Sequence, residues 1–189
     1  MRGQVKAVRE AVSRLPRDLA EHVERVVAEA DRLAAGFTGL DRERVELAAW
    51  GHDIARALSP QELLAGARRF GLEVSAVEEE ALILLHGPVG AEILRREYGI
   101  EDAEVLAAAR FHSTGRVGMS LLEKVIFVAD KVEPSKVQAK PALARVRELA
   151  HHDLDAAILE YLGQMLETAR QEGWPVHPDA LAARKELLA

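Results

Sequence analysis

Helical periodicity runs through the whole chain, and no segment shows the alternation of apolar and polar residues that is typical of a half-buried strand. Between Pro16 and Gly36, apolar residues repeat at helical spacing, namely Leu19, Val23, Val26, Ala30 and Leu33. His22 lies on the same side as this stripe. The periodicity predicts an all-α protein in which at least one histidine faces the core.

Capping signals divide the chain into successive helices. Asp41 is a good N-cap for a helix that runs toward Ile54. Ser59 and Glu62 form a capping box around Pro60, and Gly71 supplies the stop. Other boundaries predict helices over 75–86, 88–98, 102–111 and 120–130, and after Pro141, Asp153 and Pro178. The connections are short, so we expect a single domain over 1–189, with about 141–189 as a helical annex packed on it.

Composition narrows the chemistry. The chain has no cysteine, which excludes disulfides, thiolate metal sites and cysteine nucleophiles, so any metal must be held by imidazole and carboxylate groups. The formal charge of −6 argues against general binding to nucleic acid, but it leaves a small polyanion open because bound cations reverse the local field. No apolar run could cross a bilayer and no secretory signal opens the chain, so a cytoplasmic protein without a membrane partner is expected.

Four of the seven histidines fall inside or at the edge of predicted apolar helices. They are His22, His52, His86 and His112, and two aspartates, Asp53 and Asp130, share this setting. Each histidine alone could be a hydrogen-bonded core residue, and Asp130 could pair with a nearby lysine or arginine. Burying all six without a shared partner would be costly, whereas a metal centre satisfies them together.

The other three histidines are read differently. His151 and His152 precede the N-cap Asp153 on a polar stretch, and His177 stands near the last predicted helix. We expect all three to be exposed to solvent.

The order of these residues, H…HD…H…H…D, resembles the HD-domain hydrolase superfamily. It is most similar to the symmetrical bis(5′-nucleosyl)-tetraphosphatase, or diadenosine tetraphosphate hydrolase, family. The matching segments include GHDIAR (51–56), HGPVGAEILRREYGI (86–100), FHSTGR (111–116) and MSLLEKVIFVADKVEPSK (119–136). An HD pair alone is a weak signal, but the full set in order is a strong one. The resemblance implies an HD-domain helical bundle with a dinuclear metal site between its helices.

The resemblance also implies the roles of the ligands. One ion would be held by His22, His52, Asp53 and Asp130, and the other by His86, His112 and the second oxygen of Asp53. The cofactors would be two divalent transition-metal ions, with iron favoured and manganese, cobalt or zinc as alternatives. Such a pair can direct a water at phosphorus in line, so that Asp53 is catalytic as the bridge and no protein nucleophile is needed.

A second group of residues is expected to grip phosphate. Arg56 is the leading candidate and is also assigned a catalytic role, because it follows Asp53 by about one helical turn. Ser113, Thr114, Arg116 and Lys124 are further candidates, each with a surface or turn-shaping role as the alternative. The sequence departs from the family pattern at Leu19, Arg56 and Lys136, where arginine, lysine and arginine are usual. These departures leave the exact substrate open.

The sequence therefore predicts a metal-dependent phosphohydrolase of phosphoanhydride bonds in a nucleotide or dinucleoside polyphosphate. By resemblance, the substrate is diadenosine tetraphosphate, cut symmetrically to ADP. The alternatives are another HD-type nucleotidase or guanosine-polyphosphate hydrolase, a di-iron oxygenase of the inositol-oxygenase type, and a catalytically idle nucleotide sensor. The expected partner is a small nucleotide, and a homodimer is left open.

Overall fold

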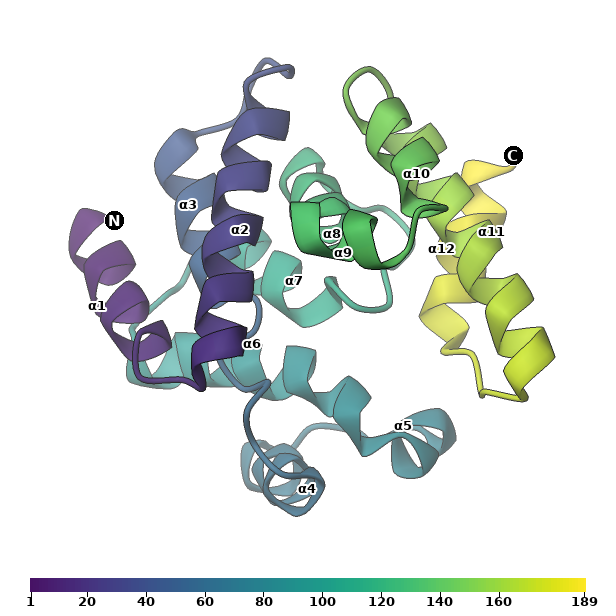
Figure 1. The fold of residues 1–189 in the computed structure, drawn as a ribbon. Coiled ribbons are helices and arrows are strands. Elements are labelled where there is room, and N and C mark those ends of the chain that lie inside the picture. The colour runs from purple at the N-terminus through teal and green to yellow at the C-terminus, as the bar shows by residue number, and fades with distance from the viewer.

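The computed structural model describes residues 1–189 and contains only helices, which confirms the all-α prediction (Figure 1). In chain order these are α1 (Arg2–Val12), α2 (Arg17–Ala34), α3 (Arg42–Gly51), α4 (Pro60–Phe70), α5 (Ala76–Glu80), the 3₁₀-helix η1 (Leu82–Leu85), α6 (His86–Glu97), α7 (Ala103–Phe111), α8 (Leu121–Val132), α9 (Pro134–Ala139), α10 (Leu143–Ala150), α11 (Leu154–Glu172) and α12 (Pro178–Leu187). None of these helices is both long and apolar enough to cross a membrane.

The predicted caps set the starts of several helices. The Asp41 side chain accepts a hydrogen bond from the backbone N–H of Arg44 at the start of α3. Ser59 and Glu62 form the complete capping box of α4, which ends at Gly71 in the left-handed conformation. Ser120 and its box open α8 in the same way. The first N–H groups of a helix have no partner within it, and these cap residues supply one. Because each cap lies within a few residues of the N–H groups that it satisfies, it can be predicted from the local sequence.

Three predicted boundaries were wrong. Helix α3 ends at Gly51 and not at Ile54, and residues 52–57 continue as a turn at the point where Leu94 of α6 packs against Gly51. The expected helix over 75–86 breaks at Ala81 into α5 and η1. Helix α6 begins at His86, two residues before Pro88, because the missing N–H of a proline costs nothing in the first turn. As a result His86 lies at the very start of a helix.

Two helices were not predicted. Helix α1 buries Val5, Val8 and Val12 against the rest of the protein, a stripe that scattered charges obscure in the sequence. Helix α9 is only one to two turns long and follows α8 directly.

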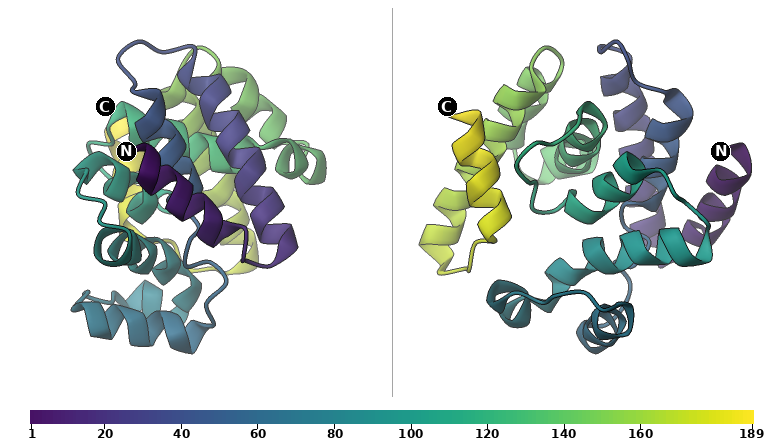
Figure 2. Two further views of the ribbon diagram at one scale, coloured as in Figure 1. Left: turned by 90° about the vertical axis from the view of Figure 1, so that its left-hand side faces the viewer. Right: turned by 180° about the vertical axis from the view of Figure 1, so that it is seen from behind.

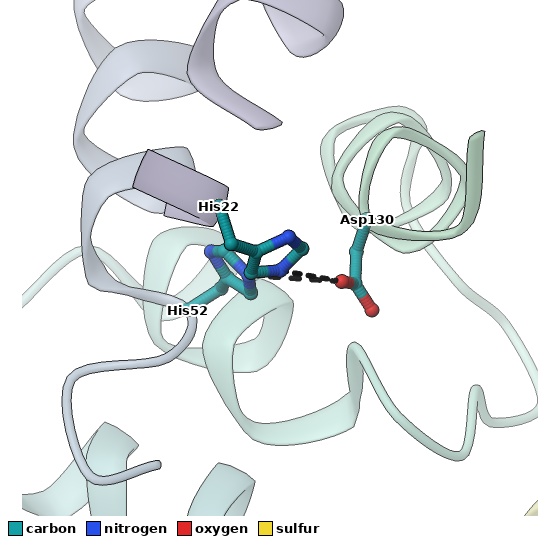
Figure 3. A group of neighbouring side chains, drawn as sticks. All are labelled: His22, His52 and Asp130. Atoms are coloured by element: carbon teal, nitrogen blue, oxygen red, sulfur yellow. Dashed lines mark ion pairs between the residues drawn. The ribbon is translucent and has the colours of Figure 1, made fainter. Parts of the chain in front are cut away.

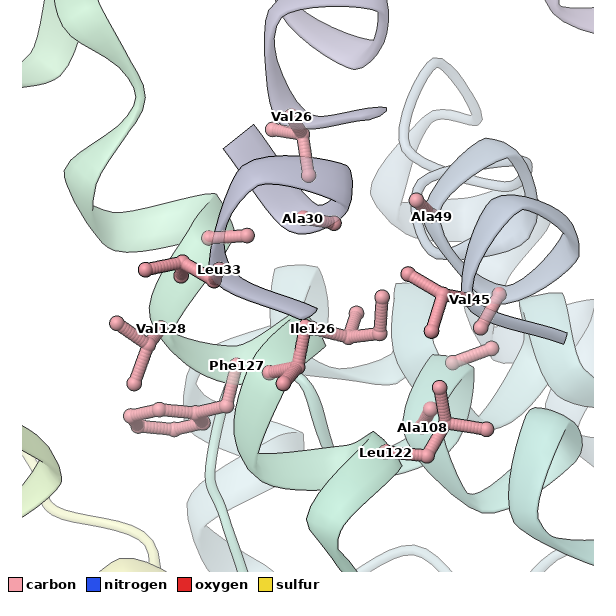
Figure 4. Packing of buried hydrophobic residues seen from close by; sticks show 14 of the residues in the cluster. Val26, Ala30, Leu33, Val45, Ala49, Ala108, Leu122, Ile126, Phe127 and Val128 are labelled. Carbon is pink, nitrogen blue, oxygen red and sulfur yellow. The ribbon is translucent and has the colours of Figure 1, made fainter. Parts of the chain in front are cut away.

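The main core lies between α2, α3, α7 and α8 (Figure 4). Its residues come from one face of each outer helix and from almost every side of α8, whose residues 125–132 are all buried. Val26, Val45, Ala108 and Phe127 represent the four helices in this cluster. Because α8 is surrounded, any polar side chain on it must find its partners inside the protein.

Two further groups of helices flank this core. Helix α4 packs with η1 and α6 around a small apolar cluster. On another side of the core, α10 and α11 pack against α8, and α12 packs on α11; this group lies across the molecule from α1, so the two termini are far apart (Figures 1 and 2). Arg147 of α10 also reaches Glu29 of α2 at 3.3 Å. The description of 141–189 as an annex of a single domain stays a prediction.

Candidate metal centre

The six residues expected to bind metal come together at the centre of the molecule. His22 lies within α2, His52 and Asp53 follow α3, and His86 opens α6; the last two residues are His112, directly after α7, and Asp130 on α8. Five of the six are buried, and the His22 side chain is only 13% exposed. Figure 3 shows the rings of His22 and His52 beside the carboxylate of Asp130.

The two carboxylate oxygens of Asp53 face different histidines. Oδ2 lies 3.7 Å from Nε2 of His22 and 3.6 Å from Nε2 of His52. Oδ1 lies 3.2 Å from Nε2 of His86 and 3.3 Å from Nε2 of His112. Asp53 therefore stands between two pairs of histidines and presents one oxygen to each.

Asp130 completes the half of the cluster around His22 and His52. Its Oδ1 lies 3.2 Å from Nε2 of His22 and 3.9 Å from Nε2 of His52. The ligand atoms of these three residues lie within 4.8 Å of one another, and those of His52, Asp53 and His112 form a second such group. Spacing of this kind suits metal ligands on a shared centre.

A close backbone approach brings the other two histidines together. A Cβ atom at Gly87 would lie 2.5 Å from the carbonyl oxygen of Arg110, so glycine allows the start of α6 to rest on the end of α7. His86 and His112 flank this contact, and their Nε2 atoms lie 3.0 Å apart. The glycine thus sets the spacing of this half of the cluster.

Hydrogen bonds fix the tautomers of three histidines. The Nδ1 atoms of His52 and His112 each lie 2.7 Å from a backbone carbonyl oxygen, and His86 makes the same kind of contact. A carbonyl oxygen only accepts, so each Nδ1 carries the proton and each Nε2 carries a lone pair.

These lone pairs point at other acceptors. Nε2 of His52 is buried, has no hydrogen-bond partner, and faces carboxylate oxygens of Asp53 and Asp130. The Nε2 atoms of His86 and His112 face each other. Acceptors converging in a buried site repel one another unless a cation lies between them, so the donor set fits divalent metal ions.

The protonation states of these histidines and aspartates also suit metal binding. Burial lowers the pKa of His52 to about 4, and it also lowers the pKa of His112. For Asp53, burial alone would raise the pKa, but the histidines around it, His52 first, hold it well below its usual value. The pKa of Asp130 is likewise held low, because Lys131 and Lys136 outweigh its burial. Neutral imidazoles and ionised carboxylates are the forms that bind metal.

Charged residues that the sequence reading did not assign surround Asp130. Nζ of Lys131 lies 2.5 Å from Oδ2 of Asp130 and donates to the carbonyl oxygen of His112 at 3.1 Å. Nζ of Lys136 lies 2.6 Å from Oδ1. The salt bridge weighed as the alternative for Asp130 is thus present together with its contact to His22. In the sequence, these contacts could have been predicted from the two lysines that closely follow an aspartate in an apolar helix.

Glu133 is a third residue to which the sequence analysis gave no role, and it contacts His22. Its Oε1 lies 3.4 Å from Nδ1 of His22, and its Oε2 lies 2.8 Å from Nε of Arg25. Burial would raise the pKa of Glu133, but hydrogen bonds from Ser135 and the charge of Arg25 lower it to about 2. The carboxylate is therefore ionised beside the histidine.

The residues expected to grip phosphate divide into two groups. In the first group, Arg56 is exposed in the turn after Asp53 and makes no ion pair or side-chain hydrogen bond. Ser113 is in the same group because its hydroxyl lies at the cluster, 3.1–3.2 Å from Nε2 of His112 and His86. In contrast, Arg116 is bound to Glu123. Lys124 forms an ion pair with Asp155, and the hydroxyl of Thr114 donates a hydrogen bond to the carbonyl oxygen of Gly115. The phosphate-binding roles stay predictions.

The three remaining histidines lie outside the cluster. His151 and His152 are exposed, as expected. The expectation was wrong for His177, whose side chain is only 14% exposed. Its Nδ1 accepts a hydrogen bond from the backbone N–H of Asp179 and so caps α12. Histidine is an uncommon cap, and the sequence pattern gave no sign of this role.

A groove of about 1290 Å³ adjoins the cluster. It includes Lys131 and Lys136, which contact Asp130, and it follows α11 as far as Trp174 and Leu188. Leucines, a tyrosine and a methionine supply much of its lining, and Gly163 of α11 forms part of it. A Cβ atom at Gly163 would meet no atom within 4 Å, so this stretch of the groove is open.

Comparisons with known proteins agree with this geometry. The sequence profile of the HD domain matches residues 19–135. The symmetrical bis(5′-nucleosyl)-tetraphosphatase of Halalkalibacterium halodurans is 39% identical over 158 residues, covering 82% of this chain and 81% of the relative. The Bacillus subtilis protein of the same name is 36% identical and covers 95% and 97%.

A solved structure extends the likeness to the whole fold. The crystal structure of a predicted HD superfamily hydrolase involved in NAD metabolism, from Clostridium acetobutylicum, superposes with a TM-score of 0.91 at 29% identity. The match covers 97% of this chain and 96% of the other. With the profile match and two relatives above 35% identity, the resemblance is confirmed. The chain belongs to the HD-domain family, in the group of the symmetrical bis(5′-nucleosyl)-tetraphosphatases.

Proposed function

We propose that this protein is a metal-dependent phosphohydrolase that cleaves diadenosine tetraphosphate symmetrically into two molecules of ADP. The observation that carries the proposal is the position of Asp53, which presents one oxygen to His22 and His52 and the other to His86 and His112. Two relatives that align over most of the chain are named as symmetrical tetraphosphatases.

We assign the ligands to two divalent ions. His22, His52, Asp53 and Asp130 would hold one, and His86, His112 and Oδ1 of Asp53 would hold the other. Imidazole and carboxylate donors suit iron, manganese, cobalt or zinc better than magnesium, and we favour iron because of the family resemblance. Two such ions, when bound, supply a water of lowered pKa and neutralise the phosphoryl oxygens.

The side chains around the proposed ions would hold the metal ligands in place and bind the phosphate groups of the substrate. Lys131 is fixed by Asp130 and the carbonyl of His112, so it holds the aspartate in place. Arg56 has no partner in the protein and stands in the turn that begins with the ligands, which leaves its guanidinium available to a phosphate. The hydroxyl of Ser113 lies beside both His86 and His112 and can donate to a phosphate oxygen there.

The groove supports a substrate larger than a mononucleotide. Its ammonium groups, Lys131 and Lys136, lie at the metal centre, where the polyphosphate would be held. Along α11 the lining is mixed, with Leu159, Tyr161 and Met165 offering apolar surface to a nucleoside and Glu160 and Glu167 offering acceptors for its polar groups. A dinucleoside polyphosphate has both a polyphosphate and nucleosides, so a groove of this length and lining can take more of it than of a mononucleotide.

A hydrolysis assay tests the proposal. The protein would be loaded with iron, manganese or cobalt and given diadenosine tetraphosphate, nucleoside triphosphates and guanosine polyphosphates, with the products separated by chromatography. We expect diadenosine tetraphosphate to give ADP alone. Equal amounts of ATP and AMP would contradict symmetrical cleavage, and the absence of hydrolysis with every metal and substrate would contradict a phosphohydrolase. Preferred cleavage of a guanosine polyphosphate would move the proposal to the nucleotidase alternative.

A further inference from the structure

Three of the four histidines in the metal centre use the backbone to fix their orientation. Their Nδ1 atoms contact the carbonyl oxygens three residues earlier, those of Ala49, Ile83 and Ala109. All three carbonyls lie in the last turn of a helix, where the final carbonyl groups have no partner within the helix. Position at a helix end therefore gives His52, His86 and His112 a ready acceptor.

His22 has no such acceptor. It lies inside α2, more than one turn from either end, where the carbonyl groups are engaged by the N–H groups of the next turn. Its Nδ1 needs an acceptor from a side chain, and Glu133 Oε1 lies 3.4 Å away. On the other side of the ring, Nε2 lies 3.2 Å from Asp130 Oδ1.

Glu133 is well placed to serve as a fixed acceptor. Its side chain is 1% exposed, and it is the N-cap of α9. It accepts hydrogen bonds from the backbone N–H and the hydroxyl of Ser135, at 2.9 and 2.6 Å, and from Arg25 at 2.8 Å. Arg25 follows His22 by one turn on the same face of α2. One carboxylate thus joins α2 to the start of α9.

We propose that Glu133 is a positioning residue for the metal centre, because it holds the proton of His22 on Nδ1 and turns the Nε2 lone pair toward Asp53 and Asp130. The inference rests on the proposed metal centre. A carboxylate that accepts from a metal-binding histidine fixes the ring and raises its basicity. The same residue caps α9, a role that the side-chain oxygen of a glutamine can keep, so Glu133→Gln separates the contact with His22 from the cap.

Metal affinity provides the test. Binding of Mn²⁺ would be measured by competition with a chelator, together with the melting temperature of the metal-free protein. Glu133→Gln keeps an oxygen that can accept from His22 but loses the charge, and we expect about 10- to 100-fold weaker binding of the ion that His22 helps to hold. Glu133→Leu removes the acceptor and should weaken binding further. Asp153→Asn is the matched control, because it removes the charge of another N-cap carboxylate, that of α11, which contacts none of the six clustered residues, and its affinity should stay within about threefold of wild type.

A double-mutant cycle separates positioning from a structural role. In a His22→Ala background, Glu133→Gln should cause no further loss of Mn²⁺ affinity, since the residue through which it acts is gone. An equal loss in that background would overturn the inference, as would a lower melting temperature with unchanged affinity in Glu133→Gln. If wild type binds Mn²⁺ and Glu133→Gln binds it equally well, only this inference fails. If wild type binds none of the candidate metals, the metal centre and this inference fail together.

Discussion

Asp53 contacts more of the cluster than any other residue, since its two oxygens face all four histidines. Asp53→Ala should abolish turnover, because neither half of the site keeps the carboxylate that joins it to the other. His151→Ala and His152→Ala are the matched controls on exposed histidines, and their rates should stay within about threefold, under roughly 0.7 kcal/mol in the barrier. Steady-state hydrolysis of diadenosine tetraphosphate measures all three variants. An active Asp53→Ala enzyme would show that the bridge is wrongly assigned.

Arg56 is the exposed cation for which the functional and surface roles differ most. If its guanidinium stabilises phosphate in the transition state, Arg56→Ala should lower turnover by about 10²-fold, equivalent to roughly 2.7 kcal/mol. Metal content should stay at the wild-type level, because arginine is not a ligand. Arg56→Lys should keep much of the rate, since it retains the positive charge. Turnover and metal content measured on both variants decide the role, and full activity in Arg56→Ala would remove it.

The six residues that meet at the candidate metal centre could be predicted one by one, but the residues around them could not. His22, His52 and Asp130 stand out in sequence because ionisable groups in apolar helices need a common partner. Glu133 looks like an ordinary helix cap in the sequence. Its second role depends on α2 lying against the start of α9, a contact between segments 108 to 111 residues apart.

At the scale of helices, the contact between α6 and α7 sets the spacing of His86 and His112. Gly87→Ala would place a Cβ atom 2.5 Å from the carbonyl oxygen of Arg110, and a backbone atom cannot rotate away as a side chain can. We expect a loss of about 1–3 kcal/mol in the free energy of unfolding. Urea denaturation of the metal-free protein measures it.

Gly163→Ala is the control for that change. Its Cβ would meet nothing within 4 Å, so alanine should be neutral or stabilise α11 by up to about 1 kcal/mol. If Gly87→Ala proved as stable as wild type, the backbone of α6 at Gly87 would not lie as close to the carbonyl oxygen of Arg110 as described.

The starts of helices were easier to predict than their ends. Ser59 and Ser120 each complete a capping box within four residues, so the whole signal lies in the local sequence. Helix α3 ends at Gly51, and His52 after it keeps helical backbone angles, so no left-handed C-cap marks this end. The placement of His52 and Asp53 in a turn therefore came only from the tertiary structure.

At the scale of the whole molecule, the groove joins the metal centre to the C-terminal helices. Gly163→Leu should extend a side chain into the groove, because Gly163 is part of its lining and a Cβ atom there meets nothing within 4 Å. We expect the KM for diadenosine tetraphosphate to rise about tenfold or more, a loss of roughly 1.4 kcal/mol in binding, while Mn²⁺ affinity stays unchanged. Gly163→Ala should leave the KM close to wild type. An unchanged KM in Gly163→Leu would place the nucleoside elsewhere.

Six side chains at the centre of the molecule, five of them buried, are proposed to hold two metal ions in one chain. The most direct test is elemental analysis of protein that has been loaded with iron, manganese or cobalt and then freed of loosely bound metal. We expect about two ions per chain, because six ligands are more than one ion needs when it must also keep a position open for water. Chelation should lower the melting temperature, since ions that bind only the folded protein stabilise it. Protein that retains no metal, and melts at the same temperature before and after chelation, would contradict a metal centre at these six residues.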